Sequence, residues 1–222
     1  GLIDAETAIK TIHSPQSFDD FESARKTLAF EEFLVLQTGV AAAKQTKTAL
    51  TAPIISDVKC IADFADKLAF ELTNAQKRVI NEISADIKRD IPMNRLVQGD
   101  VGCGKTIVAA AVMYAVAKAG YTSALMAPTE VLARQHYENL KNLFAPFNIA
   151  VAYLAGSQKA AERAENIELI SNETAKIVVG THALISDKTQ IPKLALAITD
   201  EQHRFGVRQR TKLSSSGNVH TL

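Results

Sequence analysis

The sequence has 222 residues and a mass of 24.0 kDa, enough for one large domain or one domain with an extension. Its 25 Lys and Arg residues nearly balance 24 Asp and Glu residues, which argues against a basic tail but leaves room for a local phosphate-binding patch. Two cysteines and no apolar run of ~20 residues argue against a disulfide framework and a membrane span, and favour a reducing, cytoplasmic compartment.

Residues 1–69 are predicted to form a helical connector. Phe18–Lys47 has a helical composition, with apolar residues spaced at roughly a helical period. Small and polar residues over Thr46–Asp57 predict a loop, and a short helix is predicted around Val58–Leu68. No residue in this segment has an obvious chemical role, so we expect the connector to pack on the main domain.

Residues 70–222 are predicted to form an α/β domain, because helices and strands alternate there. The predicted helices are Thr73–Lys88, Lys105–Lys118, Glu130–Leu143 and Gln158–Ile170. The predicted strands are Asn94–Gln98, Ser123–Ala127, Ile149–Leu154, Lys176–Val179 and Leu194–Thr199, with another opening at Val219–Leu222. Such alternation implies a mostly parallel sheet with helices on both faces. Ligands of these sheets bind at the carboxyl ends of the strands, so the residues after each strand are candidates for a site.

The segment Gly99-Asp-Val-Gly-Cys-Gly-Lys-Thr106 fits the phosphate-loop pattern G-x-x-x-x-G-K-[ST] between a predicted strand and a predicted helix. Its glycines allow backbone N–H groups to turn toward an anion at a helix N-terminus. Lys105 would reach the β- and γ-phosphates of ATP, and the Thr106 hydroxyl would ligate Mg²⁺. The alternative is a glycine-rich turn that merely starts a helix.

Asp200 and Glu201 directly follow the apolar strand predicted over Leu194–Thr199. In P-loop enzymes an acid after a neighbouring strand helps to hold Mg²⁺, and another group orients or deprotonates the attacking water. Asp200 is therefore the candidate metal ligand and Glu201 the candidate base. A solvated acidic turn is the alternative, which the upstream phosphate loop disfavours. The residues alone indicate no role for His203.

Three further candidates are weaker. Thr73 and Gln76 have the spacing of a helix capping box, which accounts for Gln76 as well as an adenine contact would. Ala127-Pro-Thr-Glu130 and Gly180-Thr-His182 each follow a strand and offer groups that could bind a nucleic-acid phosphate. Either segment could equally cap a helix. Their shared position at one edge of the sheet strengthens the nucleic-acid interpretation.

These motifs, in this order, resemble the first motor domain of a superfamily 2 helicase or translocase. More narrowly, Pro92–Val101, Met126–Ala133 and Asp200–Val207 resemble the RecG family of ATP-dependent branched-DNA helicases. The resemblance is strong over Phe70–Val207 and weaker over residues 12–37, which in that family link a DNA-junction wedge domain to the motor. It implies a RecA-like domain that couples ATP hydrolysis to the remodelling of replication forks and Holliday junctions in recombination and repair, near the bacterial nucleoid.

The resemblance also implies a role for each motif. Lys105, Asp200, Glu201 and His203 would be catalytic, with His203 coupling the nucleotide state to DNA contact. Thr106 and Asp200 would hold Mg²⁺. The residues that would bind ATP are Phe70, Gln76, Gly99, Gly102, Cys103, Gly104, Lys105 and Thr106. The residues that would line the DNA track are Pro128, Thr129, Gly180, Thr181 and His182.

Two positions depart from the family pattern. Cys103 stands where a small hydroxyl residue is usual, and its thiol, beside Lys105 and among inward-turned N–H groups, either favours the thiolate or simply replaces serine. Ala155 stands where we expect a hydroxyl that could contact phosphate, which leaves Gly156 and Ser157 as poor candidates for DNA contact.

Val219–Leu222 resembles the start of a strand that in this family leads into a Ser/Thr-Ala-Thr motif and a second motor domain with arginine fingers. We therefore expect the sequence to be a fragment. Its partners would be branched DNA and the second RecA-like and wedge domains of the same parent chain. Because arginine fingers contribute roughly 10³–10⁵ in rate, the fragment alone should be weakly active or inactive.

Three other interpretations remain open at this point. A transcription-repair coupling factor-like translocase has a similar motor, although Gln202 favours the RecG family. A P-loop ATPase that does not act on DNA would share the nucleotide site but would not explain the paired motifs after two strands. A structural module with a degenerate site is disfavoured by the intact Lys105, Thr106, Asp200 and Glu201.

Overall fold

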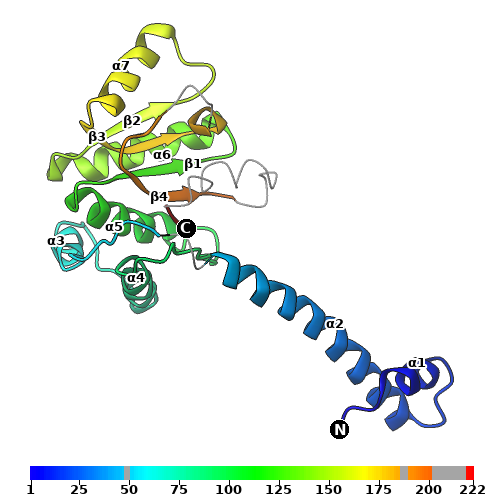
Figure 1. Cartoon of the computed structure of the whole chain (residues 1–222). Coiled ribbons are helices and arrows are strands. Elements are labelled where there is room, and N and C mark those ends of the chain that lie inside the picture. The colour runs from blue at the N-terminus through cyan, green and yellow to red at the C-terminus, as the bar shows by residue number, and fades with distance from the viewer. Residues whose placement is uncertain (48–50, 186–189, 202–218) are drawn as a thin grey trace. The chain divides into compact units, whose positions relative to one another are not determined.

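The computed structural model describes residues 1–47, 51–185, 190–201 and 219–222 (Figure 1). The chain divides into two compact units, Gly1–Ala49 and Leu50–Leu222. The predicted boundary at residues 69 and 70 therefore falls inside the second unit. The reason is hydrophobic burial: Ile55 and Phe64 are fully buried in the core of that unit, and the Phe64 ring lies 5.5 Å from the ring of Tyr114.

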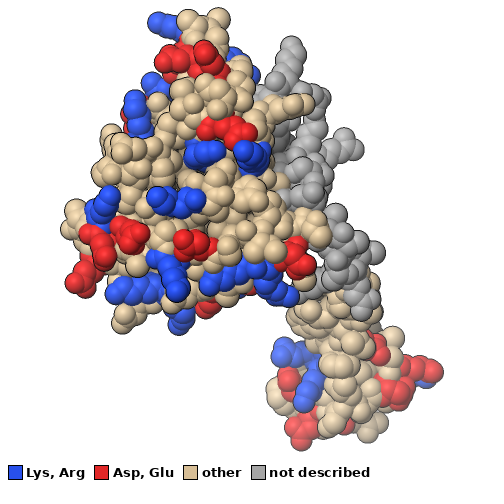
Figure 2. All heavy atoms as spheres, turned by 60° about the vertical axis from the view of Figure 1, so that its left-hand side comes forward, with Lys and Arg blue, Asp and Glu red and all other residues tan. Residues whose placement is uncertain are grey.

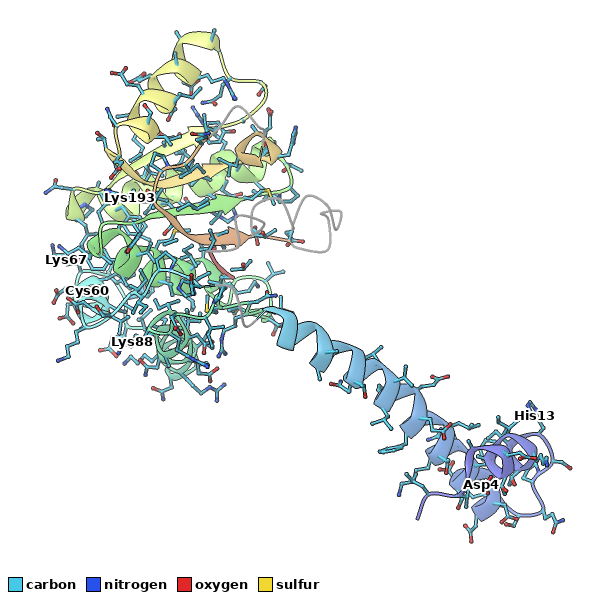
Figure 3. All side chains as sticks on the ribbon, in the orientation of Figure 1. Asp4, His13, Cys60, Lys67, Lys88 and Lys193 are labelled. Atoms are coloured by element: carbon cyan, nitrogen blue, oxygen red, sulfur yellow. The ribbon has the colours of Figure 1, made fainter. Side chains whose placement is uncertain are left out.

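The first unit contains α1 (Ala5–His13) and α2 (Phe18–Lys47). The bounds of α2 are those predicted, whereas α1 was not predicted, because its one buried residue, Ala8, gives no apolar periodicity. Asp4 caps α1 by accepting a hydrogen bond from the Thr7 N–H at 3.0 Å, and Figure 3 labels Asp4 and His13 beside this helix. Several large apolar side chains of α2 are exposed: Phe30, Phe33, Leu34, Val35, Leu36 and Val40.

The second unit alternates helices and strands much as predicted. Its α-helices are α3 (Cys60–Asp66), α4 (Asn74–Ile87), α5 (Lys105–Lys118), α6 (Glu130–Phe144) and α7 (Ala160–Ser171). Its strands are β1 (Thr122–Met126), β2 (Ala150–Leu154), β3 (Ala175–Gly180), β4 (Leu194–Thr199) and β5 (His220–Thr221). Two 3₁₀ helices, η1 (Ala145–Phe147) and η2 (His182–Ile185), complete the described elements. No helix in the described ranges is long and apolar enough to cross a bilayer.

The five described strands form one parallel sheet in the order β2-β3-β1-β4-β5. This confirms the predicted α/β fold. Met126 of β1 is in register with both Gly180 of β3 and Thr199 of β4, so these three strands end at the same level. The loops after them therefore lie along one edge of the sheet, where Figure 1 shows the strand arrows ending.

Helices cover both faces of the sheet. Leu125 of β1 joins a core cluster with α5, α6, α3 and α4, whereas its neighbours Ala124 and Met126 join a second cluster with Ile170 of α7 and Leu184 of η2. Helix α5 is buried over nine consecutive residues, 108–116. Its small Ala and Val side chains allow it to lie close to the sheet beneath it and to α3 and α4 around it.

The predicted strand Asn94–Gln98 is not a strand in the structure. Asn94 forms a single bridge to Thr221, supported by hydrogen bonds from the Arg95 N–H to the Thr221 carbonyl and from the Thr221 N–H to the Met93 carbonyl. Its sheet neighbour, β5, has only two residues, so the ladder is too short to extend the pairing. The segment is nevertheless fixed beside the sheet and leads directly into the phosphate loop.

His220 gives the second unit a predicted pH-dependent stability. The ring is fully buried: its Nδ1 accepts from the Met93 N–H at 3.1 Å, and its Nε2 donates to the Pro53 carbonyl at 2.8 Å. Burial lowers the pKa of His220 below its usual value of 6.5. The unfolded chain then takes up a proton that the folded chain does not, so stability is complete above about pH 6.5 and falls below it by up to about 1.4 kcal/mol per pH unit.

Urea unfolding between pH 7 and pH 5 measures this effect. In His220→Gln, whose side chain does not titrate, we expect the slope of unfolding free energy against pH to become shallower. His182→Gln, at an exposed position, is the matched control and should keep the wild-type slope. An unchanged slope in His220→Gln would contradict the expectation.

Candidate nucleotide site and the neighbouring strand ends

The phosphate loop, residues 99–106, ends in the N-terminus of α5. Gly102 and Gly104 have φ angles of 80° and 85°, which favour glycine because a Cβ is strained there. Gly104 is the N-cap of α5 and supplies no side-chain cap. In the described part of the chain, no protein acceptor pairs with the backbone N–H groups of Gly104, Lys105 and Thr106. These unpaired donors at a helix N-terminus suit an anion such as a nucleotide phosphate.

Lys105 lies inside this loop. Its Nζ donates to the carbonyl oxygens of Gly99 at 2.8 Å and Asp100 at 2.9 Å. The ammonium group therefore already lies in the loop and adds positive charge to it. On nucleotide binding, it would exchange its carbonyl acceptors for phosphate oxygens. The hydrogen bond from His136 is the main cause of the lowered pKa of Asp200, and the charge of Lys105 lowers that pKa further.

Gln76 joins α4 to the phosphate loop. Its backbone N–H and side-chain oxygen form the predicted capping box with Thr73, and its Nε2 donates to the Cys103 carbonyl at 3.0 Å. A Cβ on Gly104 would meet the same Nε2 group, but this is the end of a flexible side chain that can shift, so the positive φ remains the reason for glycine at this position. The capping interpretation of Gln76 is thus confirmed, while its contact with adenine stays a prediction. Phe70, the other adenine candidate, is 54% exposed.

Asp200 is fixed at the carboxyl end of β4. Its backbone N–H donates to the Met126 carbonyl at the end of β1, at 2.9 Å. Its Oδ1 accepts from the Glu201 N–H at 3.0 Å, and its Oδ2 lies 2.8 Å from Nε2 of His136 on α6. The hydrogen bond from His136 lowers the pKa of Asp200 below its usual value, against the opposing effect of burial.

Sequence reasoning missed His136. The pair spans 64 residues, so no local spacing reveals it. The available signal was position: His136 stands in the second turn of a helix that begins at the carboxyl end of β1. Histidines at such a place lie near the ligand edge of a parallel sheet.

Glu201 is exposed and has a φ angle of 53°, in the left-handed region that side chains other than glycine rarely adopt. Non-glycine residues held in this region cluster at functional sites. His203, predicted to couple nucleotide state to DNA contact, lies outside the described residues.

The groups that could hold Mg²⁺ are the half-buried Thr106 hydroxyl and the Asp200 carboxylate. Within the described ranges, no group of three or more His, Cys, Asp or Glu side chains forms a metal cage. This donor set fits Mg²⁺, which prefers oxygen ligands and is usually held by one or two carboxylates together with substrate phosphates.

The two segments predicted to contact DNA lie side by side. The Ala127 N–H after β1 donates to the Gly180 carbonyl at 2.9 Å, and the Thr181 N–H after β3 donates to the Leu154 carbonyl at 3.2 Å. Thr129 and His182 are exposed, and Pro128 is partly exposed. The Thr129 hydroxyl also caps α6 by accepting from the Leu132 N–H.

Gly180 and Thr181 do not offer a surface to DNA. Gly180 is buried, and a Cβ there would collide with the Leu154 carbonyl of β2. The close packing of β2 against β3 therefore accounts for glycine at position 180. Thr181 is 1% exposed, and its hydroxyl has no partner among the described residues. The structure therefore does not support a side-chain contact from Thr181 or a surface contact at Gly180.

Glu130 is the second residue that sequence reasoning missed. Its carboxylate accepts hydrogen bonds from both the N–H and the hydroxyl of Ser157, in the loop after β2. These bonds lower the pKa of Glu130, with the Ser157 hydroxyl as the largest cause. The carboxylate thus ties the start of α6 to the neighbouring loop. It also occupies the N–H and hydroxyl donors of Ser157.

Cys103 and Cys60 should differ sharply in reactivity. Cys103 is exposed in the phosphate loop, with its Sγ 4.0 Å from Nζ of Lys105. Cys60, labelled on α3 in Figure 3, is buried, its Sγ donates to the Asp57 carbonyl, and burial raises its pKa. We expect iodoacetamide to modify Cys103 at least about tenfold faster than Cys60.

Mass-spectrometric mapping after brief alkylation measures both rates. Because Cys103 lies in the phosphate loop, ATP–Mg²⁺ should slow its modification and leave Cys60 unaffected. Equal labelling of the two thiols, unchanged by nucleotide, would refute this prediction.

The described surface carries charges of both signs. On the face of the second unit that Figure 2 shows, Lys and Arg side chains lie among Asp and Glu side chains. Ion pairs on the second unit include Arg134–Glu162, 3.2 Å apart, and Lys193–Glu173, 2.7 Å apart. The visible face therefore forms no broad single-sign patch, in keeping with the net charge of +1.

Known proteins similar to this chain include helicases. Residues 73–218 match the DEAD/DEAH box helicase family. The chain is similar to the ATP-dependent DNA helicase RecG of Synechocystis sp., at 45% identity, and of Bacillus subtilis, at 44%. The matches cover 100% and 97% of this chain but 27% and 32% of those proteins. A solved structure of RecG bound to a three-way DNA junction covers 100% of this chain and 30% of its own, with a TM-score of 0.86 at 39% identity. The chain thus spans less than a third of the length of these relatives.

Proposed function

The chain belongs to the DEAD/DEAH box helicase family, and we propose that it is the ATP-binding motor domain of a helicase that remodels branched DNA. Its substrates would be structures such as replication forks and Holliday junctions, in recombination and repair. The proposal draws on the similarity to RecG over the whole chain and on the RecG structure with a three-way junction. Its partners would be branched DNA and the further domains of a RecG-length chain, including a second RecA-like domain and a wedge. The site of action would be the bacterial cytoplasm, at the nucleoid.

The observation that carries the proposal is that one fold holds both a phosphate loop and an acid at the carboxyl end of β4. The Lys105 ammonium is held in the loop by the Gly99 and Asp100 carbonyls. The Asp200 carboxylate is held by His136, whose hydrogen bond is the main cause of its lowered pKa, and the charge of Lys105 lowers that pKa further. We propose that Lys105 binds the β- and γ-phosphates of ATP and that Thr106 and Asp200 hold Mg²⁺. Bound Mg²⁺ would neutralise charge that develops on the phosphates during transfer.

The remaining roles follow from the same arrangement. Glu201 would orient or deprotonate the attacking water, because it directly follows the metal ligand and is exposed. Gln76 and Phe70 would contact the adenine, and His203 would relay the nucleotide state to DNA. The phosphates would be surrounded by Cys103 and by three glycines of the loop, Gly99, Gly102 and Gly104.

For DNA we propose contacts from Pro128, Thr129 and His182, the three candidates that reach the surface. They stand at neighbouring strand ends, and hydroxyl groups and helix N-termini are common phosphate contacts. Gly180 and Thr181 would support this track from beneath through their backbone hydrogen bonds.

Stimulation of ATP hydrolysis by DNA tests the proposed function. It is measured in a chain extended to the length of the RecG relatives, with a three-way junction, a linear duplex of equal length, or no DNA. We expect the junction to stimulate hydrolysis most. Equal hydrolysis in all three would favour a P-loop ATPase that does not act on DNA, and equal stimulation by junction and duplex would favour a translocase without branch preference.

A further inference from the structure

Two hydrogen bonds hold the Asp200 side chain in one orientation. The Glu201 N–H donates to Oδ1 at 3.0 Å, and the His136 ring approaches Oδ2 at 2.8 Å. The first bond comes from the next residue of the same loop. The second comes from α6, a separate element that is anchored in the core by Ala133, Leu140 and Phe144. His136 is thus the side chain that ties the Asp200 carboxylate to a rigid part of the fold.

We propose that His136 is a positioning residue that orients the Asp200 carboxylate toward Mg²⁺–nucleotide, an inference that rests on the proposed function. The His136 side chain is only 14% exposed and the Asp200 side chain is 34% exposed, so the histidine is the more buried partner and the carboxylate keeps part of its surface open to a ligand. A residue that hydrogen-bonds to a metal ligand, without contacting the metal itself, fixes the direction in which that ligand presents its remaining lone pairs.

The hydrogen-bond pattern assigns the histidine proton. An ionised carboxylate only accepts hydrogen bonds, so the 2.8 Å contact requires a hydrogen on Nε2. Nδ1 is buried and has no partner among the described residues, so the ring is held toward Asp200 through Nε2 alone. Each oxygen of Asp200 accepts one bond here and keeps lone pairs for a metal or its bound water.

Binding of the fluorescent nucleotide mant-ADP to the 222-residue chain, titrated with Mg²⁺, tests the proposal. We expect His136→Ala to raise the Mg²⁺ concentration for half-maximal binding about tenfold, as loss of such a partner usually does. Binding in EDTA should stay unchanged, because the metal takes no part in it. His136→Gln, whose amide can donate an N–H, should restore most of the Mg²⁺ dependence.

The matched control is Asn139→Ala, an exposed position one turn further along α6. It should bind like the wild type. Melting temperatures of all variants separate misfolding from positioning: a merely structural role for His136 would weaken binding equally with Mg²⁺ and in EDTA, and His136→Gln would not rescue it. Either that result, or an unchanged Mg²⁺ dependence in His136→Ala, overturns the inference. Failure of the wild-type chain to bind mant-ADP at any Mg²⁺ concentration would instead overturn the proposed nucleotide site.

Discussion

Replacing Lys105 with alanine is expected to weaken binding of ATP–Mg²⁺ by about 100-fold or more, because hydrogen bonds to charged groups are among the strongest single contacts in proteins. The Lys105 ammonium already lies inside the phosphate loop, bonded to the carbonyls of Gly99 and Asp100. The variant removes the charge that a triphosphate would meet. The fold should remain intact, since the side chain takes no part in the hydrophobic core.

Calorimetric titration with ATP–Mg²⁺ measures the loss, and a melting curve checks the fold. Lys88→Ala provides a control of equal charge change at the end of α4, where Lys88 is exposed and is labelled in Figure 3. We expect it to bind like the wild type. Undiminished heat in Lys105→Ala would show that the loop does not bind phosphate through this lysine.

Replacing Glu201 with glutamine is expected to leave ATP binding intact and to reduce turnover by about 10²–10⁴-fold, the usual contribution of a general base. A base acts on the attacking water, and holding the phosphates does not require it. Glutamine has nearly the same shape and keeps a Cβ, so the left-handed backbone at this position, with φ 53°, is equally strained in both chains.

Single-turnover hydrolysis in a chain of RecG length, with DNA present, separates the two steps. Glu165→Gln, an exposed acid on α7 remote from the strand ends, is the control and should turn over normally. Wild-type hydrolysis by Glu201→Gln would reject this residue as the base. Loss of binding together with turnover would point to a role in holding the metal.

Elements with strong local signals could be predicted from sequence almost to the residue. Helix α5 starts at Lys105, because Gly104 before it has a φ of 85°, outside the right-handed helical region, and β4 spans the apolar run Leu194–Thr199 that ends at two acids. The weaker signals gave errors. The segment Asn94–Gln98 has the composition of a strand, but its pairing depends on two residues of β5 that lie more than 120 positions away.

The site residues also divide into those with a local sequence signal and those without one. The loop residues and the acids after β4 could be proposed from the sequence because their spacing is local and their chemistry is specific. His136 and Glu130 were missed because their partners, Asp200 and Ser157, lie 64 and 27 positions away and are joined only by the fold. Thr181 was assigned to the DNA surface from its motif, but burial of a residue depends on the neighbouring strands and is not visible in a three-residue pattern.

The close approach of β2 to β3 at Gly180 affects how mutational scans of this region should be interpreted. Any larger residue at Gly180 would displace the Leu154 carbonyl and, with it, the adjoining loop that Glu130 holds through Ser157. A scan scored by growth would therefore rank Gly180 as intolerant alongside Thr129, although only Thr129 is exposed at the surface. Intolerance at these strand ends identifies a DNA contact only when affinity falls at an unchanged melting temperature.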